Sequence, residues 1–422
     1  MKIVQTYWTK PMFQKSGELY NRLQGGWPSL KYALCAMAYS CLSIKKFYPN
    51  IELVTDSLGY NLLIEELSLP YSKVDLSLNN FDVDPNLWAL AKVYSYSLQQ
   101  EPFIHVDNDI FIWGKFPSDI ENSALCCQNF EQLSKDYSEG LSLLKKYISF
   151  SNSLFENLIY NDDYLNNCFA VNAGILGGNN VDFIKFYSQY ILDFYKTRKH
   201  EFEKVGECVG LLNIILEQLS FGVLSKEKNI NINCLKHIAN FDELINNIID
   251  IYSTPIKTKY VHCLGNIKKD VFIAQQIEFH LKSQYPDYYD KINEYCIKNG
   301  FANNLDIDMN RFNIFENVYN LLSLFDNVSD FMKTVQFRLN SNHFISLENG
   351  AFLLTTPNNN IPLSGWGKIM THLDRFKTGN DIVNEFLPHL QETFNKEEIE
   401  DNVFSFLLHT IYCGNLIEFR VP

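Results

Sequence analysis

The alternation of strand and helix patterns in the first part of this chain constrains its fold more than any other feature. Short apolar runs at residues 2–8, 51–56 and 103–113 are separated by helical patterns, one over residues 32–47 and one starting at residue 60. Strands separated by helices of about ten residues or more need crossover connections, which place the strands in parallel. The sequence therefore predicts an α/β fold with a Rossmann-like, mainly parallel sheet.

Length and composition limit the class of protein. The chain has 422 residues, of which 46% are hydrophobic and 20% charged, so it can bury a sizeable core and form two or three domains. Lys and Arg number 36 against 49 Asp and Glu, which gives a net charge of −13. An acidic protein repels phosphate backbones and anionic membrane surfaces at long range. We therefore expect no nucleic-acid partner.

The spacing of the cysteines and the pattern at the N-terminus indicate in which cellular compartment we expect the protein. The ten cysteines are scattered, with no Cys-x-x-Cys pair, so neither a zinc ribbon nor a small disulfide scaffold fits. The N-terminus runs directly into a strand pattern, unlike a signal peptide. No apolar run approaches the ~18 residues of a membrane span. We expect a cytoplasmic chain with reduced thiols and no membrane span.

The C-terminal part has a different pattern from the rest. Asn349-Gly350 separates two alternating apolar runs, which is a strong hairpin signal. Three helical patterns and a short closing strand follow, an order typical of a winged-helix-like α+β module. We predict three parts: an α/β domain over residues 1–296, a helical bridge over 297–335 and the winged-helix-like module over 336–422.

The strongest chemical motif is an acidic pair at the end of an apolar strand. Asp107 and Asp109 flank Asn108, and alternation points both carboxylates to one side. Open α/β sheets bind their ligands at this carboxyl edge. Two carboxylates there can hold Mn²⁺ or Mg²⁺, which in turn neutralises a diphosphate. The alternative is a solvated acidic turn, but carboxylates among apolar residues are costly unless they are paired, exposed or bound to metal.

A second motif lies far downstream, where His262, Gly265 and Lys268 form the pattern His-x-x-Gly-x-x-Lys. A neutral imidazole can be a third metal ligand, a glycine lets the backbone approach a phosphate, and a lysine offers a cation to the same diphosphate. The alternative for His262 is a hydrogen-bonded histidine at a strand end. If the strand ends meet, the two motifs form one site.

In order along the chain, these motifs resemble a known family. From residue 1 to about 293 the chain resembles nucleotide-sugar glycosyltransferases of the GT-A fold, the kind that includes glycogenin and the lipopolysaccharide galactosyltransferases. Four features carry the resemblance: Thr6-Tyr7-Trp8 at the end of the first strand, Asp107-x-Asp109, the segment CFAVNAGILGG at residues 168–178, and the ending from His262 to Lys268. The Pro-Trp that usually follows the late lysine is missing here, and Lys269-Asp270 takes its place.

The resemblance implies a site for metal and diphosphate. Asp107, Asp109 and His262 would bind Mn²⁺ or Mg²⁺, while Gly265 and Lys268 would hold the diphosphate of the donor. Lys92, on the helix before the acidic pair, occupies the place of a basic residue that contacts the donor in the family. The alternative interpretation is that Lys92 is a surface lysine of this helix.

The resemblance also implies contacts to the base and the sugar. Thr6, Tyr7 and Trp8 would lie at the donor, with Tyr7 stacked on a uracil ring and Asp56 bonded to base or ribose. Asn172 and Gly174 would line the groove for donor sugar and acceptor. Glu217 and Gln218 resemble an acidic residue and glutamine beneath the reacting sugar, although glutamate replaces the more usual aspartate. The alternatives are strand-end residues for Tyr7 and Asp56, and a tight strand-to-loop junction at Asn172.

Residues 337–422 resemble a second family, the PqqD-like domains that recognise peptides in ribosomal peptide maturation. The matching features are Leu363-Ser364 before Gly365-Trp366, Leu373-Asp374, Thr378 with Asp381-Ile382-Val383, and a last helix ending at Gly414. Such domains add an extended leader peptide to a hairpin edge. The groove would lie between residues 343–354 and 403–412. The alternative is an accessory domain for packing or for a homodimer.

Together the resemblances predict a hexosyltransferase that moves a sugar from a nucleotide diphosphate sugar, expected to be a UDP-sugar, to a ribosomally made precursor peptide. Metal and Lys268 would stabilise the charge that builds on the leaving diphosphate. Two alternatives remain open. One is a glycosyltransferase acting on polysaccharide or lipid-linked sugar, and the other is a peptide-binding scaffold with a degenerate transferase domain.

Overall fold

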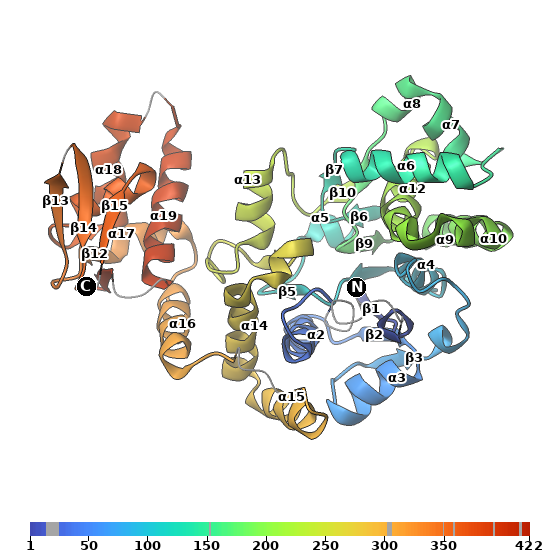
Figure 1. The fold of residues 1–422 in the computed structure, drawn as a ribbon, viewed down its shortest axis with the longest axis horizontal. Coiled ribbons are helices and arrows are strands. Elements are labelled where there is room, and N and C mark those ends of the chain that lie inside the picture. Colours follow the sequence, from blue (N-terminus) through green and yellow to red (C-terminus); the bar gives the residue numbers. More distant parts are fainter. Residues whose placement is uncertain are drawn as a thin grey trace. The chain divides into compact units, whose positions relative to one another are not determined.

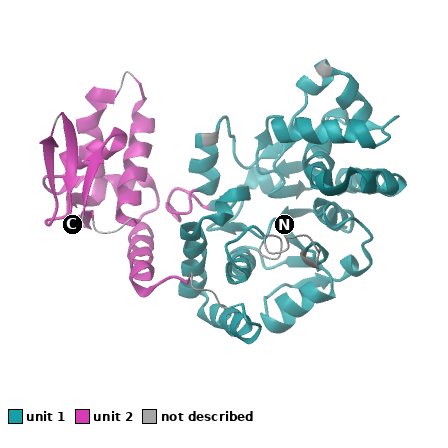
Figure 2. Ribbon diagram, viewed as in Figure 1, with its two compact units in different colours: residues 1–249, 260–305 teal, residues 250–259, 306–422 magenta. Residues whose placement is uncertain are grey.

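The computed structural model of the chain comprises two compact units. The first contains residues 1–249 and 260–305, and the second contains residues 250–259 and 306–422 (Figure 2). The structure describes residues 1–13, 25–151, 153–301, 306–348, 350–357, 359–390, 393–412 and 416–422. Residues 306–335, which the sequence assigns to the helical bridge, group with the C-terminal residues in the second unit.

A seven-stranded sheet forms the framework of the first unit (Figure 1). Its strands are β1 (Lys2–Tyr7), β2 (Ile51–Thr55), β3 (Lys73–Asp75), β4 (Phe103–Val106), β6 (Leu125–Cys127), β9 (Ile175–Gly178) and β10 (Ile232–Cys234). Their order is β10-β6-β9-β4-β1-β2-β3. Parallel pairing joins β1 to β2 and β4, β2 to β3, and β6 to β10, whereas β9 is antiparallel to β4 and β6. The mainly parallel sheet confirms the predicted α/β class.

The sheet separates two buried apolar clusters. Ile3 and Val4 are consecutive in β1, point to opposite faces and belong to different clusters. Helices α4 (Ala89–Ser97) and α9 (Val181–Thr197) contribute to the cluster of Val4, and α2 (Leu30–Lys45) contributes to that of Ile3. α2 begins at Leu30, two residues before the helical pattern in the sequence, and Ser29 caps it, because Ser29 Oγ accepts a hydrogen bond from Tyr32 N at 3.3 Å. Both faces of the sheet are therefore covered.

A small second sheet brings distant parts of the chain together beside β4. Strand β5 (Ile110–Ile112) pairs antiparallel with β11 (Tyr260–His262), and His262 lies opposite Ile110 in the register. Because β5 follows β4 after only a short turn, this pairing carries His262 to the carboxyl end of β4. The sheet register thus joins the two predicted motifs.

The second unit contains two three-stranded antiparallel sheets and four α-helices among its described residues. The sheets have the orders β16-β12-β17 and β13-β14-β15, with β12 (Gln336–Leu339), β13 (Phe344–Glu348), β14 (Ala351–Thr355), β15 (Asn360–Leu363), β16 (Lys377–Thr378) and β17 (Ile417–Arg420). The helices are α16 (Met309–Leu322), α17 (Val328–Thr334), α18 (Gly379–Leu390) and α19 (Lys396–Tyr412). This content agrees with the predicted helices and α+β module.

The predicted hairpin is present. Glu348 pairs with Ala351 in the antiparallel register of β13 and β14. Gly350 has a φ of 79°, a conformation that favours glycine. Asn349, the other residue of the predicted turn, lies outside the described residues, as does Gly414 at the predicted end of the last helix.

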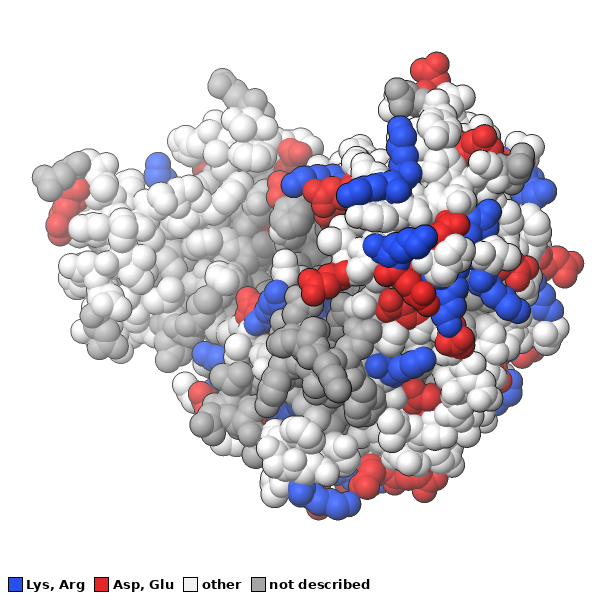
Figure 3. All heavy atoms as spheres, turned by 45° about the vertical axis from the view of Figure 1, so that its right-hand side comes forward, with Lys and Arg blue, Asp and Glu red and all other residues white. Residues whose placement is uncertain are grey.

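Two features of the structure, one buried helical stretch and the distribution of surface charge, bear on the predicted partners. One helical stretch of the described chain, residues 199–227, is long and apolar enough to cross a membrane, but 72% of its most apolar window is buried in the fold, as in a core helix. On the face shown in Figure 3, acidic and basic side chains of the described residues are interspersed. Neither property changes the expectations drawn from composition.

Candidate active site

The acidic pair lies in the turn that connects β4 to β5. Asp107 N donates to Gly174 O at 2.9 Å, and Ile110 N donates to Asp107 O at 3.2 Å. Asn108, between the two aspartates, donates from Nδ2 to Thr6 O at 2.8 Å, which fastens the turn to the end of β1. These hydrogen bonds hold the turn, and with it the Asp107 and Asp109 carboxylates, at the carboxyl edge of the sheet.

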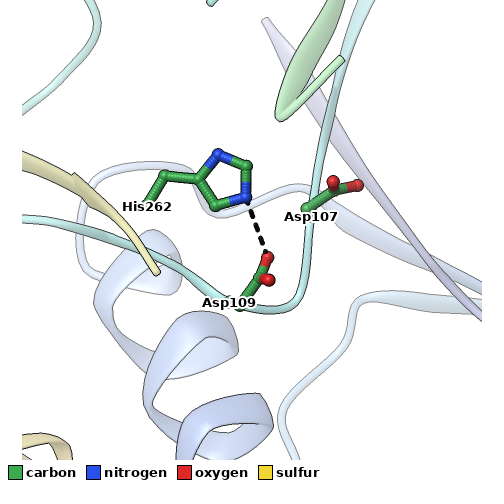
Figure 4. Close-up of side chains that lie close together, drawn as sticks. All are labelled: Asp107, Asp109 and His262. Atoms are coloured by element: carbon green, nitrogen blue, oxygen red, sulfur yellow. Dashed lines mark ion pairs between the residues drawn. The ribbon is translucent and has the colours of Figure 1, made fainter. Parts of the chain in front are cut away.

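His262 meets the acidic pair at this edge. Each of Asp107, Asp109 and His262 offers one ligand atom, and these atoms lie within 4.8 Å of one another. His262 Nε2 lies 3.3 Å from Asp109 Oδ1, and this contact is the dashed line in Figure 4. Two carboxylates and one imidazole can bind a divalent cation, and the carboxylate oxygens are ligands that Mn²⁺ and Mg²⁺ accept. The residues therefore fit the predicted metal, and the convergence of the two motifs is observed.

Lys268 forms an ion pair with Asp109 from a short 3-10 helix, Gly265–Lys269. Burial acts to raise the pKa of Asp109, but Lys268 and His262 outweigh it and hold that pKa well below its usual range. Burial likewise acts to lower the pKa of Lys268, and the carboxylate of Asp109 raises it. Asp109 is therefore ionised and Lys268 charged, as a metal and diphosphate site requires.

Lys92 lies between two carboxylates on the other side of the acidic pair. Its Nζ is 2.9 Å from Asp107 Oδ1 and 3.0 Å from Glu217 Oε1, and it donates to Ala173 O at 3.2 Å. Burial alone would lower the pKa of Lys92, but Asp107 and Glu217 raise it. Lys92 is thus a buried cation rather than a surface lysine.

Glu217 is almost fully buried and has two partners, Lys92 and the Tyr96 hydroxyl, which donates to Oε1 at 2.6 Å. Burial raises the pKa of this glutamate, although Lys92 opposes the shift. The side chain therefore lies beneath the acidic pair and contacts it through Lys92.

A cavity of about 430 Å³ opens beside the acidic pair. Seven of the predicted site residues line it: Thr6, Tyr7, Trp8, Lys92, Asp107, Asp109 and Lys268. The wall also includes Gly26, Trp27, Met37 and Trp88, which the sequence reasoning missed. The Gly25-Gly26-Trp27-Pro28 run before α2 is a local turn signal that marks part of this wall.

The Asn172 and Gln218 side chains meet through two residues that the sequence reasoning also missed. Asn172 Nδ2 donates to Glu131 Oε1 at 2.7 Å, and Asn172 Oδ1 accepts from Gly174 N at 3.0 Å. The Tyr137 hydroxyl lies 2.6 Å from Glu131 Oε2 and 2.7 Å from Gln218 Oε1. These polar groups form one cluster, but no pattern in the sequence linked Glu131 or Tyr137 to it.

Asp56 has a structural contact for each of its carboxylate oxygens. Oδ1 accepts from Gly59 N at 2.9 Å at the start of helix α3 (Ser57–Tyr60), and Oδ2 accepts from Thr9 N at 2.9 Å and Thr9 Oγ1 at 2.7 Å. Asp56 therefore caps this helix, and it is not among the described residues that line the cavity. Gly265 has a φ of 49°, a conformation that favours glycine, and no atom of the described residues outside its chain neighbours lies within 4 Å of the place that a Cβ would take.

Comparisons with solved structures found matches of low similarity. The galactosyltransferase LgtC, in complex with donor and acceptor sugar analogues, is 11% identical with a TM-score of 0.32, covering 70% of this chain and 96% of LgtC. The glycosyltransferase GlyE of Streptococcus pneumoniae TIGR4 is 13% identical with a TM-score of 0.30, covering 71% of this chain and 63% of GlyE. Mouse xyloside xylosyltransferase 1 is 10% identical with a TM-score of 0.29, and the match covers 69% of this chain and 92% of the xylosyltransferase.

Among curated proteins, none matches this chain. A family model does match, over residues 1–295, which is the part of the chain that carries the sheet, the acidic pair and His262. The chain therefore belongs to DUF6734, a family of unknown function.

Proposed function

We propose that this chain is a metal-dependent glycosyltransferase that uses a nucleotide diphosphate sugar, with a UDP-sugar as the expected donor. One observation carries the proposal: Asp107, Asp109 and His262 offer ligand atoms within 4.8 Å of one another, beside Lys268 and a cavity of about 430 Å³. A cation site next to a lysine and a ligand-sized cavity is what a diphosphate leaving group requires.

The chain's own residues would divide the work. Asp107, Asp109 and His262 would hold Mn²⁺ or Mg²⁺, which supplies a Lewis acid for the diphosphate oxygens. Lys268 places a fixed positive charge where negative charge develops as the bond to the sugar breaks. Thr6, Tyr7 and Trp8 would orient the nucleoside from the cavity wall. Lys92 and Glu217, which are buried behind the acidic pair, would act on the metal ligands.

Lys92 and Glu217 would keep the acidic pair in position. Asp107 is held by Lys92, and Lys92 in turn by Glu217, through contacts of 2.9 and 3.0 Å. Because Glu217 is nearly closed to solvent, it acts on the site through Lys92. Asn172 and Gln218, with Glu131 and Tyr137, would form the polar wall toward the acceptor.

The acceptor would be a ribosomally made precursor peptide, whose leader binds the second unit. The supporting feature is the sheet β13-β14-β15, in which β13 is an edge strand. Phe344 and Leu347 of this strand are 60% and 63% exposed. An edge strand with exposed apolar side chains suits the addition of a peptide strand.

A cytoplasmic location would agree with this acceptor and with the cysteines. Cys127 and Cys234 face each other on β6 and β10 with sulfur atoms 3.4 Å apart, well beyond the about 2.05 Å of a disulfide bond. This is a contact between two free thiols, a state that a reducing compartment would maintain.

Release of nucleotide from UDP-sugars, measured with and without Mn²⁺, tests the catalytic part of the proposal. We expect Mn²⁺-dependent release that falls at least about 100-fold in Asp109→Asn, because a metal contributes several kcal/mol to charge stabilisation. Asp119→Asn is the matched control, since this aspartate is exposed and lies away from the cavity. Release that is equal in the two variants would contradict the proposal.

Peptide binding tests the acceptor. The first step is to establish whether the reading frame next to the gene for this chain encodes a short peptide. Such a peptide should bind the full-length protein, and Leu347→Glu should weaken that binding. Leu324→Glu is the control, because Leu324 is 69% exposed but lies outside the sheet. If the two variants bind alike, the edge strand is not the peptide site, and transfer to free saccharides would then favour the polysaccharide alternative.

A further inference from the structure

Gln128 connects the strand that carries His262 to the core of the first unit. It follows β6 directly, and its side chain is fully buried. Its Oε1 lies 2.6 Å from His262 Nδ1 and 2.6 Å from the Tyr260 hydroxyl. Tyr260 and His262 are two residues apart on β11, so they point to the same side and share this one oxygen.

The orientation of the Gln128 amide follows from its neighbours. Gln128 Nε2 donates to Asn129 Oδ1 at 3.0 Å, and Asn129 Nδ2 donates to Phe130 O at 2.9 Å. Because Asn129 Nδ2 donates to Phe130 O, the Asn129 atom that faces Gln128 is its oxygen, and an oxygen needs a donor, which is Gln128 Nε2. The oxygen of the Gln128 amide is therefore the atom that faces β11.

The hydrogen bonds around this oxygen determine where the imidazole proton lies. An amide oxygen only accepts, so both the Tyr260 hydroxyl and His262 Nδ1 must donate to it. A neutral imidazole has one proton, and with that proton on Nδ1 the Nε2 atom carries a lone pair. Nε2 is the atom that faces Asp109 Oδ1 at 3.3 Å (Figure 4). Two lone pairs facing each other at this distance repel unless a positive charge lies between them, either a second proton on Nε2 or a metal ion that takes its place.

We propose that Gln128 is a positioning residue, which fixes His262 as the Nδ1–H tautomer and aims the Nε2 lone pair at the cation shared with Asp107 and Asp109. The inference rests on the metal site of the proposed function. Hydrogen bonds from a ligating histidine to a second residue orient the ring and increase its basicity.

Gly174 supplies an independent observation for the same contact. A Cβ at this position would lie 2.5 Å from Gln128 Oε1 and 2.5 Å from His262 Nδ1, the two atoms of the hydrogen bond. Only a residue without a side chain leaves room for that bond. The backbone of Gly174 also accepts from Asp107 N, so the same glycine contacts both halves of the metal site.

The first test reads the tautomer and needs no metal. Nitrogen-15 NMR of histidine-labelled, metal-free protein should show a proton on Nδ1 of His262, with the signal assigned by its loss in His262→Gln. In Gln128→Met, which has no acceptor at this place, we expect the proton to move to Nε2, where it can donate to Asp109. An unprotonated Nδ1 in the wild-type protein would overturn the inference.

The second test measures binding of Mn²⁺ alone by calorimetry or electron paramagnetic resonance. Gln128→Met should weaken binding about 10- to 100-fold, the usual cost of losing such a partner. Gln128→Glu keeps an acceptor oxygen at this place, so it should bind Mn²⁺ more tightly than Gln128→Met does, with an affinity close to that of the wild type. Tyr260→Phe removes the other donor to the same oxygen and should leave Mn²⁺ binding unchanged, which separates positioning from a general loss of packing.

The outcomes distinguish this inference from the proposed function. Wild-type protein that binds no Mn²⁺ would count against the metal site, and the NMR result on metal-free protein would still decide the tautomer. Mn²⁺ binding that is the same in wild type and folded Gln128→Met would overturn the positioning role and leave the metal site in place.

Discussion

Lys92 Nζ lies 2.9 Å from Asp107 Oδ1, so one of the two acidic residues of the candidate metal site already has a resident cation. The same ammonium group is 3.0 Å from Glu217. A single positive charge thus compensates two carboxylates, one in the site and one beneath it. Asp109 is paired with a second cation, Lys268, and both lysines line the cavity.

Replacing Lys92 should destabilise the fold. In Lys92→Met the carboxylates of Asp107 and Glu217 lose their shared partner, and breaking a buried pair in this way costs about 3–5 kcal/mol. Urea unfolding should show that loss. The double variant Lys92→Met with Glu217→Gln should be less destabilised than the sum of the single variants, because the second change removes one of the uncompensated charges. Additive effects would show that the two residues are not coupled.

The sequence predicted the strands and the convergence of Asp107, Asp109, His262 and Lys268, because those features follow from local patterns and from the rule that ligands bind at the carboxyl edge of an open sheet. It did not predict contacts that depend on register between distant strands. Gln128 meets His262 only through the pairing of β5 with β11 and the position of β6. Asp56 is predicted to contact base or ribose, and the structure adds a second role that the sequence reasoning did not consider, because an aspartate after a strand can cap the next helix.

Lys268 should compete with the metal for Asp109. In the absence of donor, Lys268→Met removes the ammonium group from that carboxylate, so we expect Mn²⁺ to bind about tenfold tighter, which corresponds to about 1.4 kcal/mol. With a UDP-sugar present, the same variant should be slower, because the leaving diphosphate loses a positive charge. Lys269→Met is the neighbouring control. Weaker Mn²⁺ binding in Lys268→Met would mean that the ion pair supports the site instead of blocking it.

A methyl group at position 174 should disrupt the metal site. In Gly174→Ala the new Cβ would lie 2.5 Å from both Gln128 Oε1 and His262 Nδ1, so one of these side chains must move. Overpacking of this kind costs about 1–3 kcal/mol, and we expect Mn²⁺ affinity to fall with it. Gly210→Ala is the control, because the nearest atom to its Cβ among the described residues would be Asn86 O at 3.8 Å, an ordinary contact distance. Thermal unfolding and Mn²⁺ titration of both variants check the expectation, which fails if Gly174→Ala binds Mn²⁺ like wild type.

Acid should weaken the first unit through His280 in helix α14 (Val271–Gln284). The ring stacks on Tyr39 with centroids 5.5 Å apart, and burial lowers the pKa of His280 to about 3. Because the folded pKa lies below the unfolded value of about 6.5, the neutral ring favours folding above pH 6.5, and this contribution is lost as the pH falls from there toward 3. At pH 5 this effect lowers the free energy of unfolding by about 2 kcal/mol relative to pH 7. Urea unfolding at pH 7 and pH 5 should therefore show a smaller decrease in His280→Gln than in wild type, and equal decreases would exclude this histidine as a source of acid sensitivity.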